Sequence, residues 1–598
     1  MNKEYLFSNL GFLCEPKREI SDKRLRTKWN SIPYETGGFK GEMLVSLGSS
    51  KANDVFLNPE LEGWYKIFVG LYAVNYHTSG LEMKLSSDKA FVKISTSMQR
   101  EYSEHIVEDV FWKCAKMDGE KIVIGKHLAK DYAFDAMIAW IRLVPMTDEE
   151  VQHYHYEKSR TDTKRIYATN DMHCMLCMSD MKTEESWRNV VQEYIDSDVE
   201  WLAIETIDHN DGNLIGCDID EFSFHGVFDK NFQRDIKKYY SDDVMKNIVA
   251  YGKEQGFKMC ISTRVSFWGA EFPHDEMYFD QKFAADNPGL RCIDRDGEIV
   301  DYMSFMYPEV QEYLIERFKK MASFGPDAVQ PLFSRGWPYI LFEKPFTDLF
   351  MKRYGEDARE LPLDDERIIE LKCEIMTDFV RKLKNAIVEV NPQIELHAKV
   401  MFSIYDNLLV GLDLEAWAKE GLVERIVTAE RRIREIVPDS IRQDADKSKI
   451  DIEKYAAYAN SSFEPPVVYH YDAIFEPLED SKGVLRGPKD NPERIREFVR
   501  LEKEYGMTAY IEIMPRILPP DKIKRKALEI YDAGATHIGL WDTYSRSPRK
   551  VEWSMWSRIG HMNELKDFSN GEGEFYTAHR LKKIGTKDVR CYHPVWGG

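Results

Sequence analysis

Residues 507–542 read MTAYIEIMPRILPPDKIKRKALEIYDAGATHIGLWD and contain a strand, a helix and a second strand. The apolar runs 509–513 and 537–541 have the length and the β-branched and aromatic content of strands, and prolines and a glycine bound the helical stretch between them. Such a unit belongs to a parallel sheet, because the helix carries the chain back across the sheet. Glu512 lies inside the first strand, where a carboxylate is costly unless it has a partner or a role.

The same alternation of strand and helix runs through residues 165–560. Eight such units predict an α/β fold of the (β/α)8 TIM barrel type. A further strand-like run, Val467–Tyr471, competes with Val423–Thr428 for the sixth position, and the sequence leaves both open. The expected barrel strands are 165–169, 201–205, 258–263, 328–333, 394–400, 423–428, 509–513 and 537–541.

Residues 1–150 contain short strand-like runs separated by turn residues, which predict an N-terminal antiparallel β-sandwich. Aromatic residues such as Trp64 and Tyr65 could let this domain bind carbohydrate, although ordinary core and surface positions are the favoured explanation. We expect residues 151–164 to be a linker and residues 561–598 to be a C-terminal tail packed on the barrel.

Composition excludes several classes of partner. The net charge of −20 argues against nucleic acid, whose phosphates need a basic surface. The chain has no apolar run of the length that a bilayer span or a secretory signal requires, and its nine cysteines are scattered. We therefore expect a cytoplasmic protein that binds neither nucleic acid nor membrane, and a homo-oligomer is compatible with the sequence.

Charged and aromatic residues lie at or just beyond the ends of most expected strands. Barrel enzymes place their active sites at the C-terminal ends of the strands, so these residues predict a charged cleft for a polar substrate. Buried charges can also simply satisfy one another, and the arginines among them could either bind an anionic ligand or balance the barrel's own carboxylates. The predicted substrate-binding residues are Asp171, His173, Glu205, Arg264, Arg335, His397, Glu430, Arg516, Trp541 and Asp542.

A family resemblance rests on eight segments of the sequence: 287–297 (NPGLRCIDRDG), 307–310 (YPEV), 333–336, 342–345, 353–362, 412–422, 541–546 and 558–561. These segments resemble family-10-like glycosylhydrolases, a group of (β/α)8 proteins. The resemblance implies glycoside hydrolysis by a pair of carboxylates, with Glu512 as nucleophile or base and Glu343 as the acid. Many relatives carry an aspartate where this chain has Leu332, so Asp171, Glu205 and Glu430 stay open as the acid.

The sequence thus predicts a glycoside hydrolase without metal or cofactor, exo-acting on an oligosaccharide or glycoconjugate. One alternative is a glycosidase for acidic sugars such as sialic or uronic acid, with His397 or His173 as acid or base and arginines as the anion site. Another is a non-catalytic carbohydrate-binding protein, since fold alone does not confer activity. A metal-dependent hydrolase built on Asp171, His173, Asp208 and His209 is disfavoured, because no HxH or HxxxH spacing supports it.

Overall fold

The computed structural model describes most of the chain. No helix in the described segments has both the length and the hydropathy that crossing a bilayer requires. The described residues are 3–23, 25–48, 52–72, 80–94, 106–126, 135–172, 183–206, 222–223, 242–265, 280–334, 337–429, 491–513, 520–541 and 550–588.

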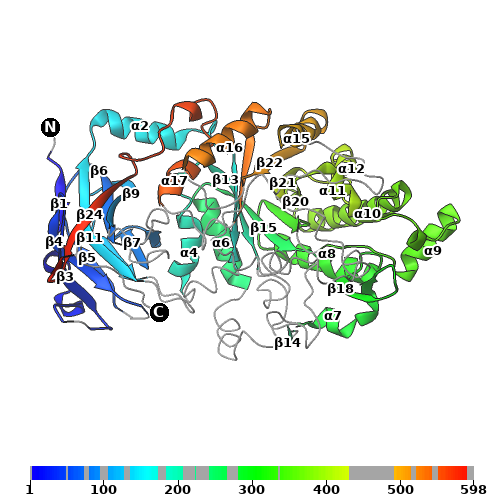
Figure 1. The fold of residues 1–598 in the computed structure, drawn as a ribbon, viewed down its shortest axis with the longest axis horizontal. Coiled ribbons are helices and arrows are strands. Elements are labelled where there is room, and N and C mark those ends of the chain that lie inside the picture. The colour runs from blue at the N-terminus through cyan, green and yellow to red at the C-terminus, as the bar shows by residue number, and fades with distance from the viewer. Residues whose placement is uncertain are drawn as a thin grey trace.

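Eight parallel strands close into a barrel, as the sequence predicts (Figure 1). The sixth strand is Arg425–Ala429, which decides between the two segments that the sequence left open; Val467–Tyr471 lies outside the described residues. The barrel strands in order are β12 (Ile166–Asp171), β13 (Val199–Glu205), β15 (Lys258–Arg264), β19 (Ala328–Leu332), β20 (Glu395–Met401), β21 (Arg425–Ala429), β22 (Thr508–Glu512) and β23 (His537–Trp541).

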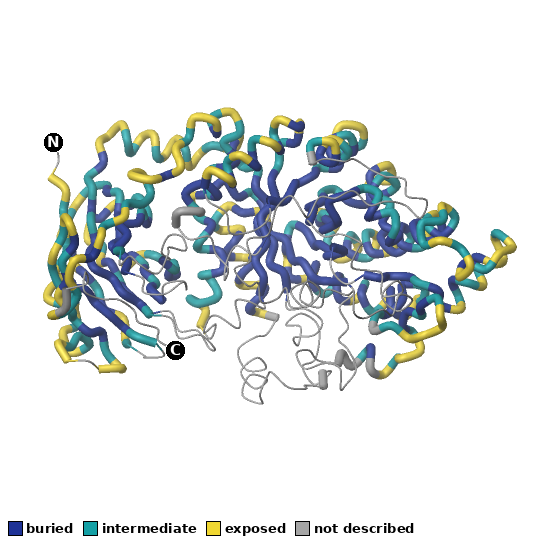
Figure 2. Tube along the Cα trace, in the orientation of Figure 1, coloured by how far each residue is buried: buried dark blue, intermediate teal, exposed yellow. Residues whose placement is uncertain are grey.

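Helices between the strands cover the outside of the barrel. Outward side chains of β20, such as Leu396 and Val400, share one hydrophobic cluster with helix residues such as Phe379. The strands themselves are buried except near their first residues (Figure 2). The helices are α4 (Glu184–Gln192), α6 (Asp242–Glu254), α8 (Pro308–Ala322), α10 (Glu366–Val390), α12 (Leu414–Lys419), α15 (Asn491–Tyr505), α16 (Pro520–Asp532) and α17 (Lys550–Trp556).

Shorter elements are inserted between these units. They are α7 (Lys282–Asp286), α9 (Lys344–Tyr354), α11 (Ile404–Leu409), the two-stranded sheet of β14 (Phe222–Ser223) and β16 (Asp280–Gln281), and the two-stranded sheet of β17 (Arg291–Ile293) and β18 (Ile299–Met303).

The N-terminal part is built on two largely antiparallel sheets at one end of the molecule (Figure 1). Side chains of both sheets, such as Val69 and Met83, belong to one hydrophobic cluster. The larger sheet contains β1 (Tyr5–Phe7), β2 (Ile20–Ser21), β3 (Trp29–Thr36), β4 (Lys40–Ser46), β6 (Trp64–Tyr72), β9 (Ile106–Lys116), β11 (Ala136–Pro145), β24 (Tyr576–Ile584) and β25 (Lys587–Asp588). The smaller contains β5 (Val55–Leu57), β7 (Leu81–Leu85), β8 (Val92–Ile94) and β10 (Ile122–Lys126).

The C-terminal segment differs from the tail that the sequence predicts. Ile559 and Leu565 do pack into the barrel's outer core, but β24 pairs with both β9 and β3 of the N-terminal sheet. This double pairing closes β3, β4, β11, β6, β9 and β24 into a ring around Trp140 and Leu581. Closing the ring satisfies the two strand edges that would otherwise be open, which is the physical reason for the difference.

Trp64 and Tyr65, the aromatic residues considered as carbohydrate-binding residues, pack against other side chains of the protein. Tyr65 is 6% exposed. The ring of Trp64 lies against Tyr154 and His155 of α2 (Asp148–Ser159), with centroid distances of 5.6 and 5.0 Å. Tyr65 is buried and Trp64 is partly covered by these two rings, which favours the packing interpretation of both residues.

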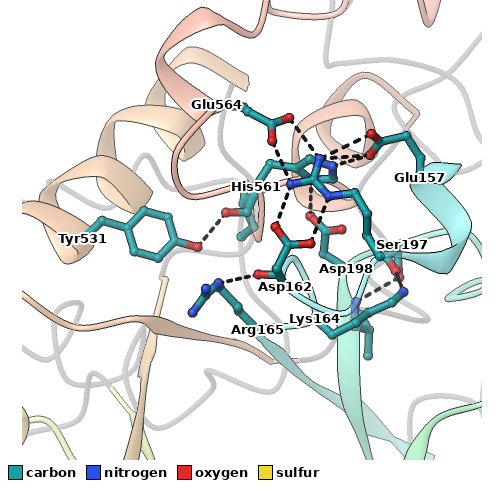
Figure 3. A network of polar contacts seen from close by, with 12 residues as sticks. Glu157, Asp162, Lys164, Arg165, Ser197, Asp198, Tyr531, His561 and Glu564 are labelled. Carbon is teal, nitrogen blue, oxygen red and sulfur yellow. Dashed lines mark hydrogen bonds and ion pairs between the residues drawn. The ribbon is translucent and has the colours of Figure 1, made fainter. Parts of the chain in front are cut away.

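A network of charges joins α2 to the barrel and to the C-terminal segment (Figure 3). His561 Nδ1 lies 2.7 Å from Asp198 Oδ2, and His561 Nε2 lies 2.8 Å from Glu157 Oε2. Arg160 Nη2 donates to Glu564 Oε1 at 2.7 Å. The predicted linker, residues 151–164, therefore lies largely within α2. Thr147 caps the N-terminus of this helix, and the charge network anchors its C-terminal end.

This network predicts that stability falls at alkaline pH. Burial alone lowers the pKa of His561, but the hydrogen bonds and charges of Asp198 and Glu157 outweigh it and raise the pKa to about 9. Because the folded pKa exceeds the unfolded value, the stabilisation is complete below pH ~6.5 and is lost as the pH rises through 9. Its size is on the order of 3 kcal/mol. Urea unfolding from pH 6 to 10 should show this loss in the wild type and not in His561→Gln; parallel profiles would contradict it.

Candidate functional site

Glu205, Arg264 and Trp541, which the sequence placed at the ends of three different strands, are in contact. Glu205 Oε1 accepts a hydrogen bond from Arg264 Nε at 3.2 Å, and Glu205 Oε2 accepts one from Trp541 Nε1 at 2.9 Å. All three side chains point into the barrel, since they share the parity of interior residues such as Ala203 and Cys260. Three of the predicted site residues therefore meet at the C-terminal end of the barrel.

A second ion pair lies on the other side of the tryptophan. Lys399 Nζ donates to Glu512 Oε1 at 2.8 Å, and both side chains are 0% exposed. The same ammonium lies 3.9 Å from the centroid of the Trp541 ring, a cation–π distance. The backbone N–H of Glu512 donates to Thr428 Oγ1 at 3.1 Å. Trp541 thus links two buried carboxylates, each of which has its own cation.

Lys399 was not among the predicted site residues. The signal that could have found it is the alternation of Glu395, His397 and Lys399 along one face of β20, which places the lysine nearest the C-terminal end. A lysine with no exposed surface needs a carboxylate partner, and Glu512 is an inward carboxylate of a nearby strand.

Asp171 and Leu332 complete the described part of this layer. Asp171 is the last residue of β12, lies in register with Glu205 and is 8% exposed. Leu332, at the position where relatives of the resembling family carry aspartate, packs with Ala429 and Trp541. Trp541 therefore has apolar neighbours on β19 and β21 as well as the Lys399 ammonium of β20, and the carboxylates of this layer lie on β12, β13 and β22.

His397 lies deeper in the barrel than predicted for a substrate-binding residue. Its Nδ1 lies 3.1 Å from the hydroxyl oxygen of Tyr167, and its Nε2 lies 2.8 Å from Glu395 Oε2. The Tyr167 hydroxyl oxygen accepts a hydrogen bond from Gln330 Nε2. Burial raises the pKa of Glu395, but the hydrogen bonds from His397 and Arg425 outweigh it and lower the pKa to about 2. An ionised carboxylate only accepts, so Nε2 carries the proton and Nδ1 accepts from Tyr167.

The same environment keeps the imidazole neutral. Burial lowers the pKa of His397 to about 4, and the nearby Glu395 offsets this only in part. A histidine that is 0% exposed and already engaged at both nitrogens is suited to holding the barrel interior together. The predicted role of His397 in contacting substrate is not supported by this geometry.

Glu343 is also placed differently from its predicted role as the acid. It precedes α9 and is buried, and both of its carboxylate oxygens lie 3.1 Å from the backbone nitrogen of Leu341. Burial raises the pKa of Glu343, while Cys292, Leu341 and Lys372 act in the opposite direction. Its described partners thus come from its own loop, β17 and α10, and none of them belongs to the cluster around Trp541. Among the described residues, the carboxylate therefore joins parts of the insertion after β19 to α10.

The remaining predicted site residues lie outside the described part of the chain. Within the described part, no three His, Cys, Asp or Glu side chains are grouped as they would be around a metal ion. The undescribed residues are His173, Arg335, Glu430, Arg516 and Asp542.

Fold and site together define a class: a (β/α)8 barrel with a buried cluster of carboxylates, cations and one tryptophan at the C-terminal strand ends, where barrel enzymes have their active sites. No protein-family model matches the sequence, and no curated protein matches it. The resemblance to family-10-like glycosylhydrolases is therefore not confirmed.

Solved structures with a loosely similar fold include two β-galactosidases and one glycoside hydrolase domain. The β-galactosidase of Marinomonas ef1 is 10% identical over 63% of this chain, with a TM-score of 0.37; that of Halorubrum lacusprofundi is 12% identical over 68%, with a TM-score of 0.39. The matches span 53% and 58% of those two chains. The glycoside hydrolase domain of PelA from Pseudomonas aeruginosa is 10% identical, with 64% of this chain and 95% of that domain covered and a TM-score of 0.29. Matches with TM-scores and sequence identities this low say nothing about the chemistry of the site.

Proposed function

We propose that the protein is a glycoside hydrolase whose active site is the cluster around Trp541. The observation that supports this most is the linkage of two inward carboxylates, Glu205 and Glu512, through one tryptophan at the C-terminal end of the barrel. Hydrolysis of a glycosidic bond needs two carboxyl groups on either side of the bond, and an indole ring offers an apolar surface to sugar C–H groups. The resemblance of several sequence segments to family-10-like glycosylhydrolases also favours a glycoside hydrolase.

Glu512 takes the role of nucleophile or base in this proposal. Lys399 lies 2.8 Å from its carboxylate and stabilises the ionised form, which both roles require. The acid is Glu205 of β13 or Asp171 of β12, two strands that are paired with each other. A separation of ~5–5.5 Å between the two catalytic carboxyl groups would retain configuration at the sugar, and ~6.5–9.5 Å would invert it.

The substrate we propose is a neutral oligosaccharide or glycoconjugate, attacked at its end. The alternative of an acidic sugar depends on arginines that can receive an anion. In the described part of the chain, Arg264 is already paired with Glu205, and Lys399 is paired with Glu512. This matching favours a neutral sugar.

The proposal is tested by incubating the full-length chain with a panel of aryl glycosides and aryl uronides. We expect hydrolysis of one or more neutral glycosides. If the folded protein hydrolyses none of them, and calorimetry shows an oligosaccharide bound and recovered intact, the non-catalytic alternative replaces the proposal.

Glu343→Gln separates the site proposed here from the carboxylate pair that the sequence predicted. We expect this variant to keep turnover within a few-fold of the wild type, because Glu343 contacts α10 and β17 residues and not the cluster around Trp541. Its melting temperature should fall, since Lys372 loses a buried counter-charge, at a cost of about 1–3 kcal/mol. Steady-state kinetics and thermal unfolding measure both effects. A loss of turnover without a loss of stability would restore Glu343 as a candidate acid.

A further inference from the structure

A surface groove of about 750 Å³ lies on the N-terminal part of the molecule. It is formed by α1 (Leu10–Leu13), the turn Lys17–Glu19 and the paired strands β3 and β4. These two strands lie at the end of the molecule away from the barrel strands (Figure 1). The groove is therefore separate from the cluster around Trp541.

One side of the groove carries an exposed aromatic ring. Phe12 is 75% exposed, although the chain around it is well anchored. Leu10 is fully buried, the N–H of Phe12 donates to the carbonyl of Asn9 at 3.0 Å, and Glu15 forms two backbone hydrogen bonds with Phe56. Lys17 Nζ lies 5.4 Å from the centre of the Phe12 ring and donates to the carbonyl of Cys14 at 2.7 Å. The turn therefore holds a large apolar ring in water at the edge of the groove.

The lining of the groove also contains polar and acidic side chains. Ser31 Oγ donates to Glu42 Oε2 at 2.7 Å, and the N–H of Glu42 donates to the carbonyl of Ser8 at 3.0 Å, so this carboxylate is held in place by the β3–β4 pair. Asp22 contributes a second carboxylate to the lining, and Lys17 the one cation. Carboxylates accept strong hydrogen bonds from hydroxyl groups and repel anions.

We infer that this groove binds a neutral carbohydrate chain at a site distinct from the barrel. A pyranose ring has an apolar C–H face that suits Phe12 and hydroxyl groups that suit Glu42, Asp22 and Ser31. The volume lies within the ~300–1,000 Å³ of small-ligand sites, whereas a stable protein partner would need ~800 Å² of this surface with an apolar centre. The groove would hold the enzyme on a polymer or glycoconjugate while the barrel acts on it.

The test is affinity electrophoresis of the full-length chain in native gels that contain a neutral glucan, a xylan, a galactan or, as an anionic probe, polygalacturonate. We expect at least one neutral polysaccharide to retard the wild type. Phe12→Ala and Glu42→Gln should each weaken that binding about tenfold or more, because one removes the apolar surface and the other the charged acceptor. The matched control is Tyr156→Ala, another exposed aromatic residue that does not line the groove and should migrate as the wild type does.

A second readout separates the groove from the barrel. Turnover of a small aryl glycoside should be unchanged in Phe12→Ala, since such a substrate occupies only the barrel site. The inference is overturned if no neutral polysaccharide retards the wild type, or if Phe12→Ala is retarded as strongly as the wild type. It is also overturned if polygalacturonate binds best, or if Phe12→Ala abolishes dimer formation without any effect on glycan binding, which would assign the groove to a second copy of the chain.

Discussion

Replacing Lys399 with methionine is expected to lower the free energy of unfolding by about 3–5 kcal/mol. Lys399 and Glu512 are both 0% exposed and lie 2.8 Å apart, so removing the ammonium leaves a carboxylate buried without its cation. The charge of Lys399 also faces the ring of Trp541, and that contact is lost as well. Urea unfolding followed by circular dichroism measures the change.

The control for this variant is Lys258→Met. Lys258 also forms a 2.8 Å ion pair, with Glu200, but its side chain is 49% exposed. A surface pair of this kind contributes about 1 kcal/mol or less, so the control should lose little. The double variant Lys399→Met, Glu512→Gln should regain most of the stability that Lys399→Met loses, because no unpaired charge remains. If the double variant is as unstable as the single one, the two side chains are not coupled as their contact implies.

Replacing Glu512 with glutamine is expected to lower kcat/KM for a hydrolysed aryl glycoside by about 10²–10⁴-fold. Glutamine keeps the shape of the side chain but can act neither as nucleophile nor as base. Stability should change less than in Lys399→Met, because Lys399 can donate to the amide oxygen of glutamine. Steady-state kinetics on the aryl glycosides that the wild type hydrolyses provide the measurement. Wild-type turnover in a folded Glu512→Gln protein would remove this carboxylate from the mechanism.

The barrel could be predicted because its pattern is local. Each unit carries a short apolar run, a turn signal and an amphipathic helix, and the last strand was predicted with the bounds that the structure has, His537–Trp541. The inward direction of Glu205 and Glu512 followed from the two-residue period of a strand. The predicted bounds of the other barrel strands differ by one or two residues, which is the usual uncertainty at strand ends.

The parts that could not be predicted depend on contacts between distant segments. Nothing local indicates that β24 closes the N-terminal ring, since its partners β3 and β9 lie more than 450 residues earlier in the chain. The same holds for the link from Glu205 to Trp541, 336 residues apart. Glu343 was misplaced because a carboxylate after the fourth strand looks the same in sequence whether it reaches the barrel or stays with its own insertion.

The identity of the site can be read from a crystal structure of Glu512→Gln soaked with an oligosaccharide that the wild type hydrolyses. A sugar bound over Trp541, with hydroxyl or glycosidic oxygens within ~3.2 Å of Glu205 and of residue 512, is the predicted result. A sugar that binds elsewhere in the barrel or only in the N-terminal groove, with the strand ends around Trp541 unchanged, would contradict the proposed active site.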